Sequence, residues 1–276
     1  MSFISSKKDL NTSKIIIFGC PFDSTSSFRP GSRFGPSSIR NVSDLIETYS
    51  PVLDLDLEDV DFFDYGDLEL IFGNTQKSLN IIENFVKENL AKSKTLIGLG
   101  GEHLISYPII KAYYSVYPDI NIIHLDAHAD LREDYLGEKF SHATVMKRTI
   151  DLIGNGRVHS FGVRSGTRDE FKIINLYSKD KIIDFIKSTD KPLYFTLDLD
   201  VLDPSILPAT GTPEAGGISF NDLMDIIYSF KGKKLVGADI VELAPMYDNY
   251  TNSSAVAAKI LRELILVFDF NFKINC

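Results

Sequence analysis

The sequence predicts an α/β fold, with one α/β/α domain of three layers that spans residues 1–276 around a largely parallel sheet of eight strands. Three observations predict this class. Short apolar runs alternate with helix-periodic segments along the whole chain, as in βαβ units. Most runs are continuously apolar, as expected of strands that are covered on both faces. No linker, internal repeat or change of composition divides the chain.

Eight apolar runs are the candidate strands. In chain order they are Lys14–Phe22, Val60–Gly66, Lys94–Gly100, Asn121–Ala127, Arg157–Val163, Ile173–Tyr177, Leu193–Asp200 and Leu235–Val241. Between them, apolar side chains recur at helical spacing over residues 79–90, after a cap at Asn74 or Thr75, and again over residues 253–266. We interpret both helical stripes as faces that pack on the core.

Charge excludes several classes of partner. The chain has 29 Lys and Arg against 38 Asp and Glu, so its net charge is −9. An acidic surface repels nucleic-acid phosphates and anionic lipid headgroups. The one basic cluster, at residues 231–234, is too short for a nucleic-acid footprint. We therefore expect neither nucleic acid nor a membrane as a partner.

Cysteine content and the first residues predict the compartment. Cys20 and Cys276 lie near opposite ends of the chain and form neither a disulfide framework nor a C-x-x-C pair. Residues 1–14 lack the apolar core of a signal peptide, and no run approaches the about 18 apolar residues of a membrane span. These features favour a cytoplasmic protein.

Polar residues interrupt four of the predicted strands at their carboxyl ends, where open parallel sheets bind ligands. The four stretches are Gly98–His103, Asp126–Asp130, Asp198–Asp200 and Val241–Leu243. Side chains alternate along a strand, so Asp126, His128 and Asp130 should project from one side, and Asp198 and Asp200 from one side of another strand. Each pair of carboxylates about 4 Å apart repels by roughly 4 kcal/mol at an effective dielectric constant of about 20. Two divalent cations would neutralise all four aspartates.

The ligand types indicate which cations fit. Carboxylate oxygens with one or two imidazoles favour Mn²⁺, with Mg²⁺, Fe²⁺ or Co²⁺ as alternatives, over structural zinc. Two such ions can hold a bridging water and lower its pKa toward neutrality, which is hydrolase chemistry. A lone Asp-x-Asp pair is usually a solvated loop, whereas D-x-H-x-D within an apolar strand is costly to bury without cations.

The remaining histidines are weaker candidates. The two glycines before His103 let the backbone pass close to a site, although an ordinary loop histidine is an equal alternative. His124 is expected to contact ligand side chains or to fill the core. His159 is expected to be structural.

Together these motifs resemble the ureohydrolase family of arginases and agmatinases, and most of all the bacterial agmatinases. The stretches that carry the resemblance are GGEH at 100–103, DAHAD at 126–130, SFGVRS at 160–165 and DLDVLDPS at 198–205. The resemblance implies a single ureohydrolase domain with an arginase-like fold and two Mn²⁺ ions per subunit. It also implies a small-molecule guanidino substrate, release of urea, and a homo-oligomer, usually a trimer or hexamer.

The resemblance also implies residue roles. The metal ligands would be His103, Asp126, His128, Asp130, Asp198 and Asp200. The catalytic residues would be Asp130, which holds the nucleophile, His142, which shuttles protons, and Glu242, which pairs with the substrate guanidinium. A carboxylate suits the donor fork of a guanidinium, and histidine titrates near neutrality. Glu102 stands where many family members have Asp, a position that is not itself a ligand in the family.

The activities of the family differ in the chemical group that the substrate carries at the end away from its guanidinium. Arginases typically have Asn at the position of Arg132 and an Asp-containing stretch at the position of residues 165–167, so both amino-acid anchors are replaced here. Agmatine is therefore the first choice, with conversion to putrescine and urea. The alternative substrate is 4-guanidinobutyrate, whose carboxylate Arg132 would contact, because Arg is a natural partner for carboxylates. Arginase is the third choice.

Two other classes remain as alternatives. A metallophosphatase could use the same ligands but needs a phosphate cradle, and no G-x-x-x-x-G-K-[ST] loop is present. A nucleotide-binding module is suggested by Gly98, Gly100 and Gly101, but the spacing fails G-x-G-x-x-G because position 103 is His.

Overall fold

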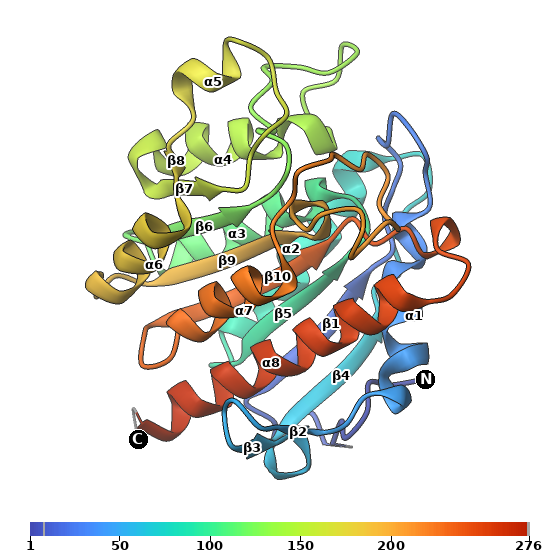
Figure 1. Cartoon of the computed structure of the whole chain (residues 1–276), viewed down its shortest axis with the longest axis vertical. Helices are drawn as coiled ribbons and strands as arrows, with labels where there is room; N and C mark the ends of the chain where they lie inside the picture. The colour runs from blue at the N-terminus through green and yellow to red at the C-terminus, as the bar shows by residue number, and fades with distance from the viewer. Residues whose placement is uncertain (8, 275–276) are drawn as a thin grey trace.

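The computed structural model describes residues 1–7 and 9–274, and its centre is a sheet of eight strands (Figure 1). Across the sheet the order is β4-β1-β5-β10-β9-β6-β7-β8, and every neighbouring pair is parallel. The strands of this sheet are β1 (Ile15–Cys20), β4 (Phe62–Asp67), β5 (Thr95–Gly100), β6 (Asn121–Leu125), β7 (Val158–Phe161), β8 (Leu176–Tyr177), β9 (Leu193–Asp198) and β10 (Leu235–Val241).

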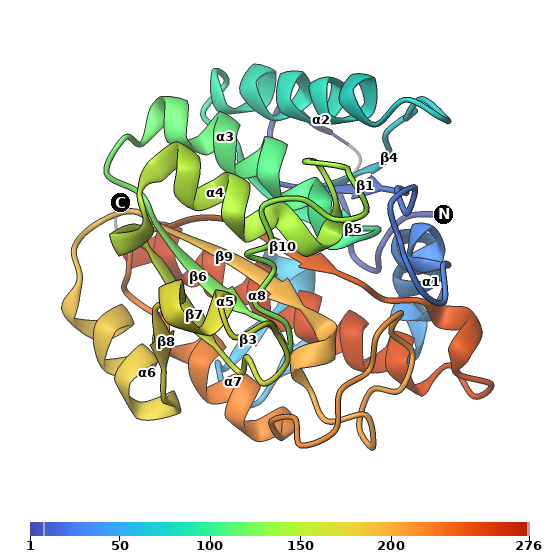
Figure 2. The same ribbon diagram turned by 90° about the horizontal axis from the view of Figure 1, so that it is seen from above.

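Helices cover both faces of the sheet (Figure 2). One face carries α2 (Thr75–Leu90), α3 (Ser106–Val116) and α4 (Val145–Ile153). The other carries α1 (Gly35–Val42), α6 (Lys179–Ser188), α7 (Phe220–Ser229) and α8 (Asn252–Ile274). A short helix, α5 (Glu170–Ile173), lies between β7 and β8. The two apolar layers bury the sheet on both sides, which explains why its strands are continuously apolar.

The predicted α/β/α class with eight parallel strands is confirmed, and both helical stripes form helices. At the start of α2 the side chain of Asn74 accepts a hydrogen bond of 2.9 Å from the backbone N–H of Lys77, which is the cap expected there. A hairpin of β2 (Tyr49–Ser50) and β3 (Leu55–Asp56) was not predicted, because such short strands contain no apolar run.

Several strand ends differ from the prediction in a way that matters for the site. β6 ends at Leu125, so the whole DAHAD stretch lies in the loop that follows the strand. β9 ends at Asp198, and Asp200 lies in a 3₁₀ helix, Leu199–Val201. β8 is shortened at its start because residues 170–173 form α5.

The structure bears on the predictions about the cysteines and about membrane spans for the residues that it describes. Cys20 is buried in β1, whereas Cys276 lies outside the described residues. Within residues 1–7 and 9–274, no helix is long and apolar enough to cross a membrane.

Candidate functional site

The four strands that were predicted to end in polar residues are neighbours in the sheet, in the order β5-β10-β9-β6. They run in parallel, so their carboxyl ends meet at one edge. His103 follows β5, Glu242 follows β10, Asp198 ends β9 and Asp126 follows β6. Strand order therefore brings together residues that lie far apart in the sequence.

The loop after β6 places its three polar side chains by its own path and not by strand alternation, which corrects the predicted geometry. Asp126 accepts a 2.6 Å hydrogen bond from the backbone N–H of His128, and Ala127 donates one of 2.9 Å to Asp200. Asp130 adopts a left-handed backbone, with φ of +52°, which is unfavourable for a residue with a side chain. These local bonds turn all three side chains toward the same cluster.

His103 forms the buried half of that cluster. Its Nδ1 lies 3.0 Å from Oδ2 of Asp126, 3.3 Å from Oδ2 of Asp130 and 3.5 Å from Oδ2 of Asp198. Only 1% of the His103 side chain is exposed. On the other side of the ring, Nε2 lies 3.0 Å from the hydroxyl of Thr196, which leaves Nδ1 to face the three carboxylates.

His128 forms the more open half. Its Nδ1 lies 2.9 Å from Oδ2 of Asp200 and 3.5 Å from Oδ1 of Asp126, and 24% of its side chain is exposed. Asp126 therefore presents one carboxylate oxygen to each histidine. The six residues expected as ligands come together in this cluster around Asp126.

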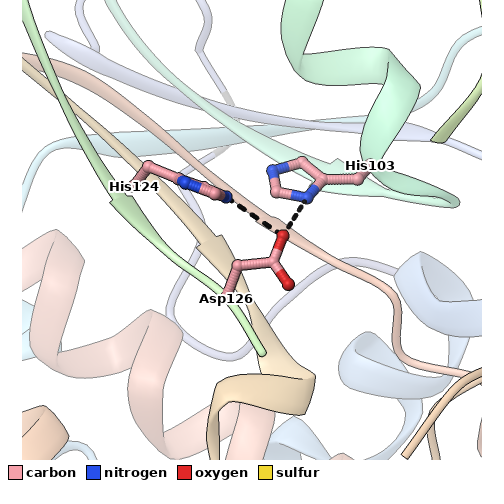
Figure 3. A group of neighbouring side chains, drawn as sticks. All are labelled: His103, His124 and Asp126. Carbon is pink, nitrogen blue, oxygen red and sulfur yellow. Dashed lines mark hydrogen bonds and ion pairs between the residues drawn. The ribbon is translucent and has the colours of Figure 1, made fainter. Parts of the chain in front are cut away.

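His124 lies closer to the cluster than its depth in β6 suggested. Its Nε2 is 3.0 Å from the same oxygen of Asp126 that faces His103, as Figure 3 shows. Its Nδ1 is 3.0 Å from the hydroxyl of Ser160, and the side chain is fully buried. This position matches the expected contact with a ligand side chain. His159 in β7 is also buried but lies away from the cluster, between Tyr177 and Asn121.

The charges of the cluster test whether cations fit. Burial, followed by the negative charges of Asp200 and Asp126, raises the pKa of Asp198 well above its usual range. Burial alone would lower the pKa of His128, but hydrogen bonds to Asp126 and Asp200 raise it to about 12. Nδ1 of His103 is buried and makes no hydrogen bond of good geometry. Divalent cations would replace the protons that otherwise hold these groups together, so the donor set fits them.

A cavity of about 210 Å³ opens beside the cluster. The side chains that line it include His128, Asp130 and Asp198 together with Glu242, His142 and Arg132. The expected substrate-contacting residues thus face the same space as the cluster. Arg132 is exposed, and its guanidinium lies 5.2 Å from the ring centre of Tyr135.

Glu242 is held in place by the backbone of His103, a member of the cluster. Its Oε1 accepts a 2.7 Å hydrogen bond from the backbone N–H of His103. Glu242 has a left-handed backbone, with φ of +68°, immediately after β10. Burial and the negative charge of Glu102 raise the pKa of the Glu242 carboxyl well above its usual range, so a cationic partner would favour its ionised form.

His142 begins a 3₁₀ helix, His142–Thr144, opposite Glu242 in the cavity lining. Its Nε2 lies 3.3 Å from the hydroxyl of Ser27, and its Nδ1 lies 3.4 Å from that of Thr25. Burial lowers the pKa of its imidazole, so the neutral ring is favoured near neutral pH.

The sequence analysis missed three residues of this region, Thr25, Ser27 and Glu170. Thr25 and Ser27 belong to a polar turn after β1, and the rule that ligands bind beyond strand carboxyl ends could have found it. Glu170 lines the cavity and is buried, and its carboxylate accepts hydrogen bonds from the backbone of Leu131 (3.0 Å) and Thr167 (2.7 Å). The T-x-x-E spacing of Thr167 and Glu170 is a local signal that could have found it, because the backbone N–H of Glu170 also donates to the hydroxyl of Thr167 (3.2 Å), as in a capping box. The contact with Leu131, 39 positions away, has no local signal.

Comparisons with known proteins agree with this geometry. The chain is 48% identical to an agmatinase of Bacillus cereus, over 96% of this chain and 95% of the relative, and 47% identical to an agmatinase of Bacillus subtilis, over 96% of each. The solved structure of agmatine ureohydrolase of Thermoplasma volcanium matches with a TM-score of 0.91 and 34% identity, covering 100% of this chain and 96% of that one. The model of the arginase family matches residues 13–267. This chain is a member of the arginase family.

Proposed function

We propose that the protein hydrolyses agmatine to putrescine and urea. The observation that carries this proposal is the shared cavity, which residues of the carboxylate–histidine cluster line together with Glu242 and His142. The similarity to agmatinases over nearly the whole chain supports the same substrate. A carboxylate whose ionisation needs a cationic partner suits a guanidinium group.

The six residues of the cluster would hold two divalent cations, which we propose to be Mn²⁺. His103, Asp126, Asp130 and Asp198 surround one position, and His128, Asp200 and Asp126 surround the other. Oxygen-rich sites with one imidazole each suit Mn²⁺. When bound, the two cations would supply a water of lowered pKa and stabilise the negative charge of the transition state.

The protein's own side chains would bind and orient the substrate. Glu242 would accept N–H groups of the guanidinium, because Oε1 keeps a lone pair beyond its bond to His103 and Oε2 is free for a second bond. Asp130 would orient the attacking water by accepting its hydrogen bond. His142, whose ring is neutral near pH 7 because burial lowers its pKa, would take the proton that the attacking water releases and pass it to the leaving amine.

The far end of the substrate lies toward Arg132. Of the described residues that line the cavity, Arg132 is the only arginine or lysine, and it is exposed at the side of Tyr135. A single exposed cation offers no cradle for a phosphate group, so the cavity does not favour a metallophosphatase. It does keep 4-guanidinobutyrate as the second candidate, because Arg132 could pair with a carboxylate there.

The test of the substrate is urea release by the Mn²⁺-loaded protein. We would measure kcat/KM for agmatine, arginine and 4-guanidinobutyrate in parallel. We expect a preference for agmatine. A preference for 4-guanidinobutyrate that Arg132→Ala abolishes would replace agmatine with the acid, and absence of urea from all three would overturn the guanidino assignment.

The test of the proton path is His142→Asn. We expect kcat for agmatine to fall by about 100-fold or more, a typical loss when a general acid is removed. Metal content should stay unchanged, because His142 lies outside the six proposed ligands. Plasma mass spectrometry and urea release measure both quantities, and an unchanged kcat would remove His142 from the proton path.

We further propose a homo-oligomer, a trimer or hexamer, located in the cytoplasm. The arginase-family membership supports the assembly, and the acidic, cysteine-poor composition supports the compartment. Light scattering on the purified protein measures the assembly directly. A monomer at micromolar concentration would refute it.

A further inference from the structure

A buried glutamate outside the proposed ligands braces the turn that follows β1. Glu102 is 0% exposed and does not belong to the cavity lining. Its carboxylate accepts hydrogen bonds from the backbone N–H of Thr25 (2.8 Å), from the hydroxyl of Thr25, and from the hydroxyl of Ser26 (3.4 Å). A buried carboxylate with three donors on one turn holds that turn in a single position.

The same turn contacts His142 from the other side. The hydroxyl oxygen of Thr25 accepts a 3.1 Å hydrogen bond from the backbone N–H of His142 and lies 3.4 Å from its Nδ1. Ser27 of the turn is 3.3 Å from Nε2. Thr25 therefore links the carboxylate of Glu102 to both the backbone and the ring of His142.

The direction of these bonds constrains the imidazole. A threonine hydroxyl has one proton, and Thr25 donates it to Glu102. Its oxygen can then only accept from His142, so a bond to Nδ1 requires the proton on Nδ1. The hydroxyl of Ser141, 3.3 Å from Nδ1, can accept from the same N–H group. The neutral ring would carry its free lone pair on Nε2, beside Ser27.

We propose that Glu102, acting through the hydroxyl of Thr25, positions His142 and selects the tautomer with its proton on Nδ1. Glu102 and Thr25 are positioning residues, because neither is placed to touch the reacting atoms. The proposal rests on the proposed role of His142 in proton transfer. It also assigns a purpose to a fully buried acid that neither binds metal nor faces the substrate.

Three variants test the link in the Mn²⁺-loaded protein. Thr25→Val removes the hydroxyl at nearly constant volume, whereas Thr25→Ser keeps it. Glu102→Gln keeps the shape but can no longer accept both Thr25 donors. We expect Thr25→Val and Glu102→Gln to lower kcat for agmatine about tenfold with KM changed less than about twofold, because the ring is misplaced and the substrate contacts are not. Thr25→Ser should retain most of kcat.

Each variant is then combined with His142→Asn. If Glu102 and Thr25 act through the His142 ring, their variants should lower kcat by less than about twofold in the H142N background, because the ring on which they act is already absent. Equal losses in both backgrounds would overturn the proposal, as would a Glu102→Gln effect confined to KM, which would indicate action through Glu242. A full kcat in H142N alone would instead refute the proposed role of His142.

Asp23 provides the matched control. It is also a buried carboxylate that braces the same loop, accepting a 3.0 Å bond from the backbone N–H of Gly31 and pairing with Arg33, and within the described part of the chain its carboxylate makes no hydrogen bond to Thr25. Any kcat loss in Asp23→Asn should be equal in the wild-type and H142N backgrounds. Coupling of Asp23 to His142 as strong as that of Glu102 would mean that the loop as a whole, and not the Thr25 hydroxyl, is responsible, which would overturn the proposal.

Discussion

His103 and His128 at the carboxyl ends of the central strands can be compared with His159, which lies in β7, beside the edge strand β8 of the same sheet. His103 and His128 lie among four aspartates. His159 is also buried, with 4% of the residue exposed, but its ring nitrogens lie 3.0 Å from the hydroxyl of Tyr177 and 3.0 Å from the amide oxygen of Asn121. The ring of Phe185 packs on it with centres 3.8 Å apart.

The surroundings shift the pKa values of these imidazoles in opposite directions. The aspartates raise the pKa of His128 to about 12 in spite of its burial, whereas burial lowers the pKa of His159 to about 4 because no carboxylate opposes it. The residue type is the same in the two regions, and His103 and His159 are both buried, whereas His128 is partly exposed. The difference shows that the number of carboxylates around a buried histidine distinguishes a cation site from a structural histidine.

The largest effect is expected from Asp126→Asn, because Asp126 faces both histidines of the cluster. Its loss should remove bound Mn²⁺ and lower activity beyond the roughly 10- to 100-fold loss that changes around a metal's ligands usually cause. Plasma mass spectrometry and urea release measure the two effects. His159→Gln is the control and should keep both metals. Retention of two Mn²⁺ ions by Asp126→Asn would break the comparison.

An intermediate effect is expected from His124→Gln. His124 contacts the Asp126 oxygen that faces His103, and partners of this kind orient a ligand without binding the metal. Metal affinity, measured by competition with a chelator, should fall by about 10- to 100-fold, with kcat largely restored at saturating Mn²⁺. Ser160→Ala removes only the bond to Nδ1 and should have a smaller effect. An unchanged affinity in His124→Gln would reduce His124 to a core residue.

The smallest effect is expected for the pH dependence that comes from His159. Its folded pKa of about 4 lies below the unfolded value near 6.5, so between these values the unfolded chain binds a proton that the folded chain does not. The contribution of neutral His159 to the free energy of unfolding is therefore complete above about pH 6.5. It is lost as the pH falls toward 4, by about 2 kcal/mol after allowance for partial solvent access. Urea unfolding at several pH values measures it.

Two variants separate this titration from other acid-sensitive groups. His159→Gln should flatten the fall in stability between about pH 6.5 and 4, whereas Tyr177→Phe removes a hydrogen bond but leaves the titrating ring and should keep the fall. If the two variants depend on pH in the same way, His159 does not carry the effect.

Local features of the sequence determined the strands and the composition of the site. Six of the eight runs are apolar because their strands are covered on both faces, and that property is visible within four to seven residues. The edge strands β4 and β8 are partly exposed. The same holds for the α2 cap at Asn74. The D-x-H-x-D stretch was informative because buried acids need counter-charges wherever the chain places them. The prediction that strand alternation aligns Asp126 with Asp130 was wrong, because β6 ends at Leu125, one residue before Asp126.

Only the tertiary structure decided which of these residues meet. His103 and Asp198 come together because only β10 lies between β5 and β9 in the sheet, an order that no local pattern encodes. The contact of Thr25 with His142 joins residues 117 positions apart through two loops. Such contacts depend on how strands are ordered and how loops close between them, and these are properties of the whole chain because they are set by packing and not by local preference.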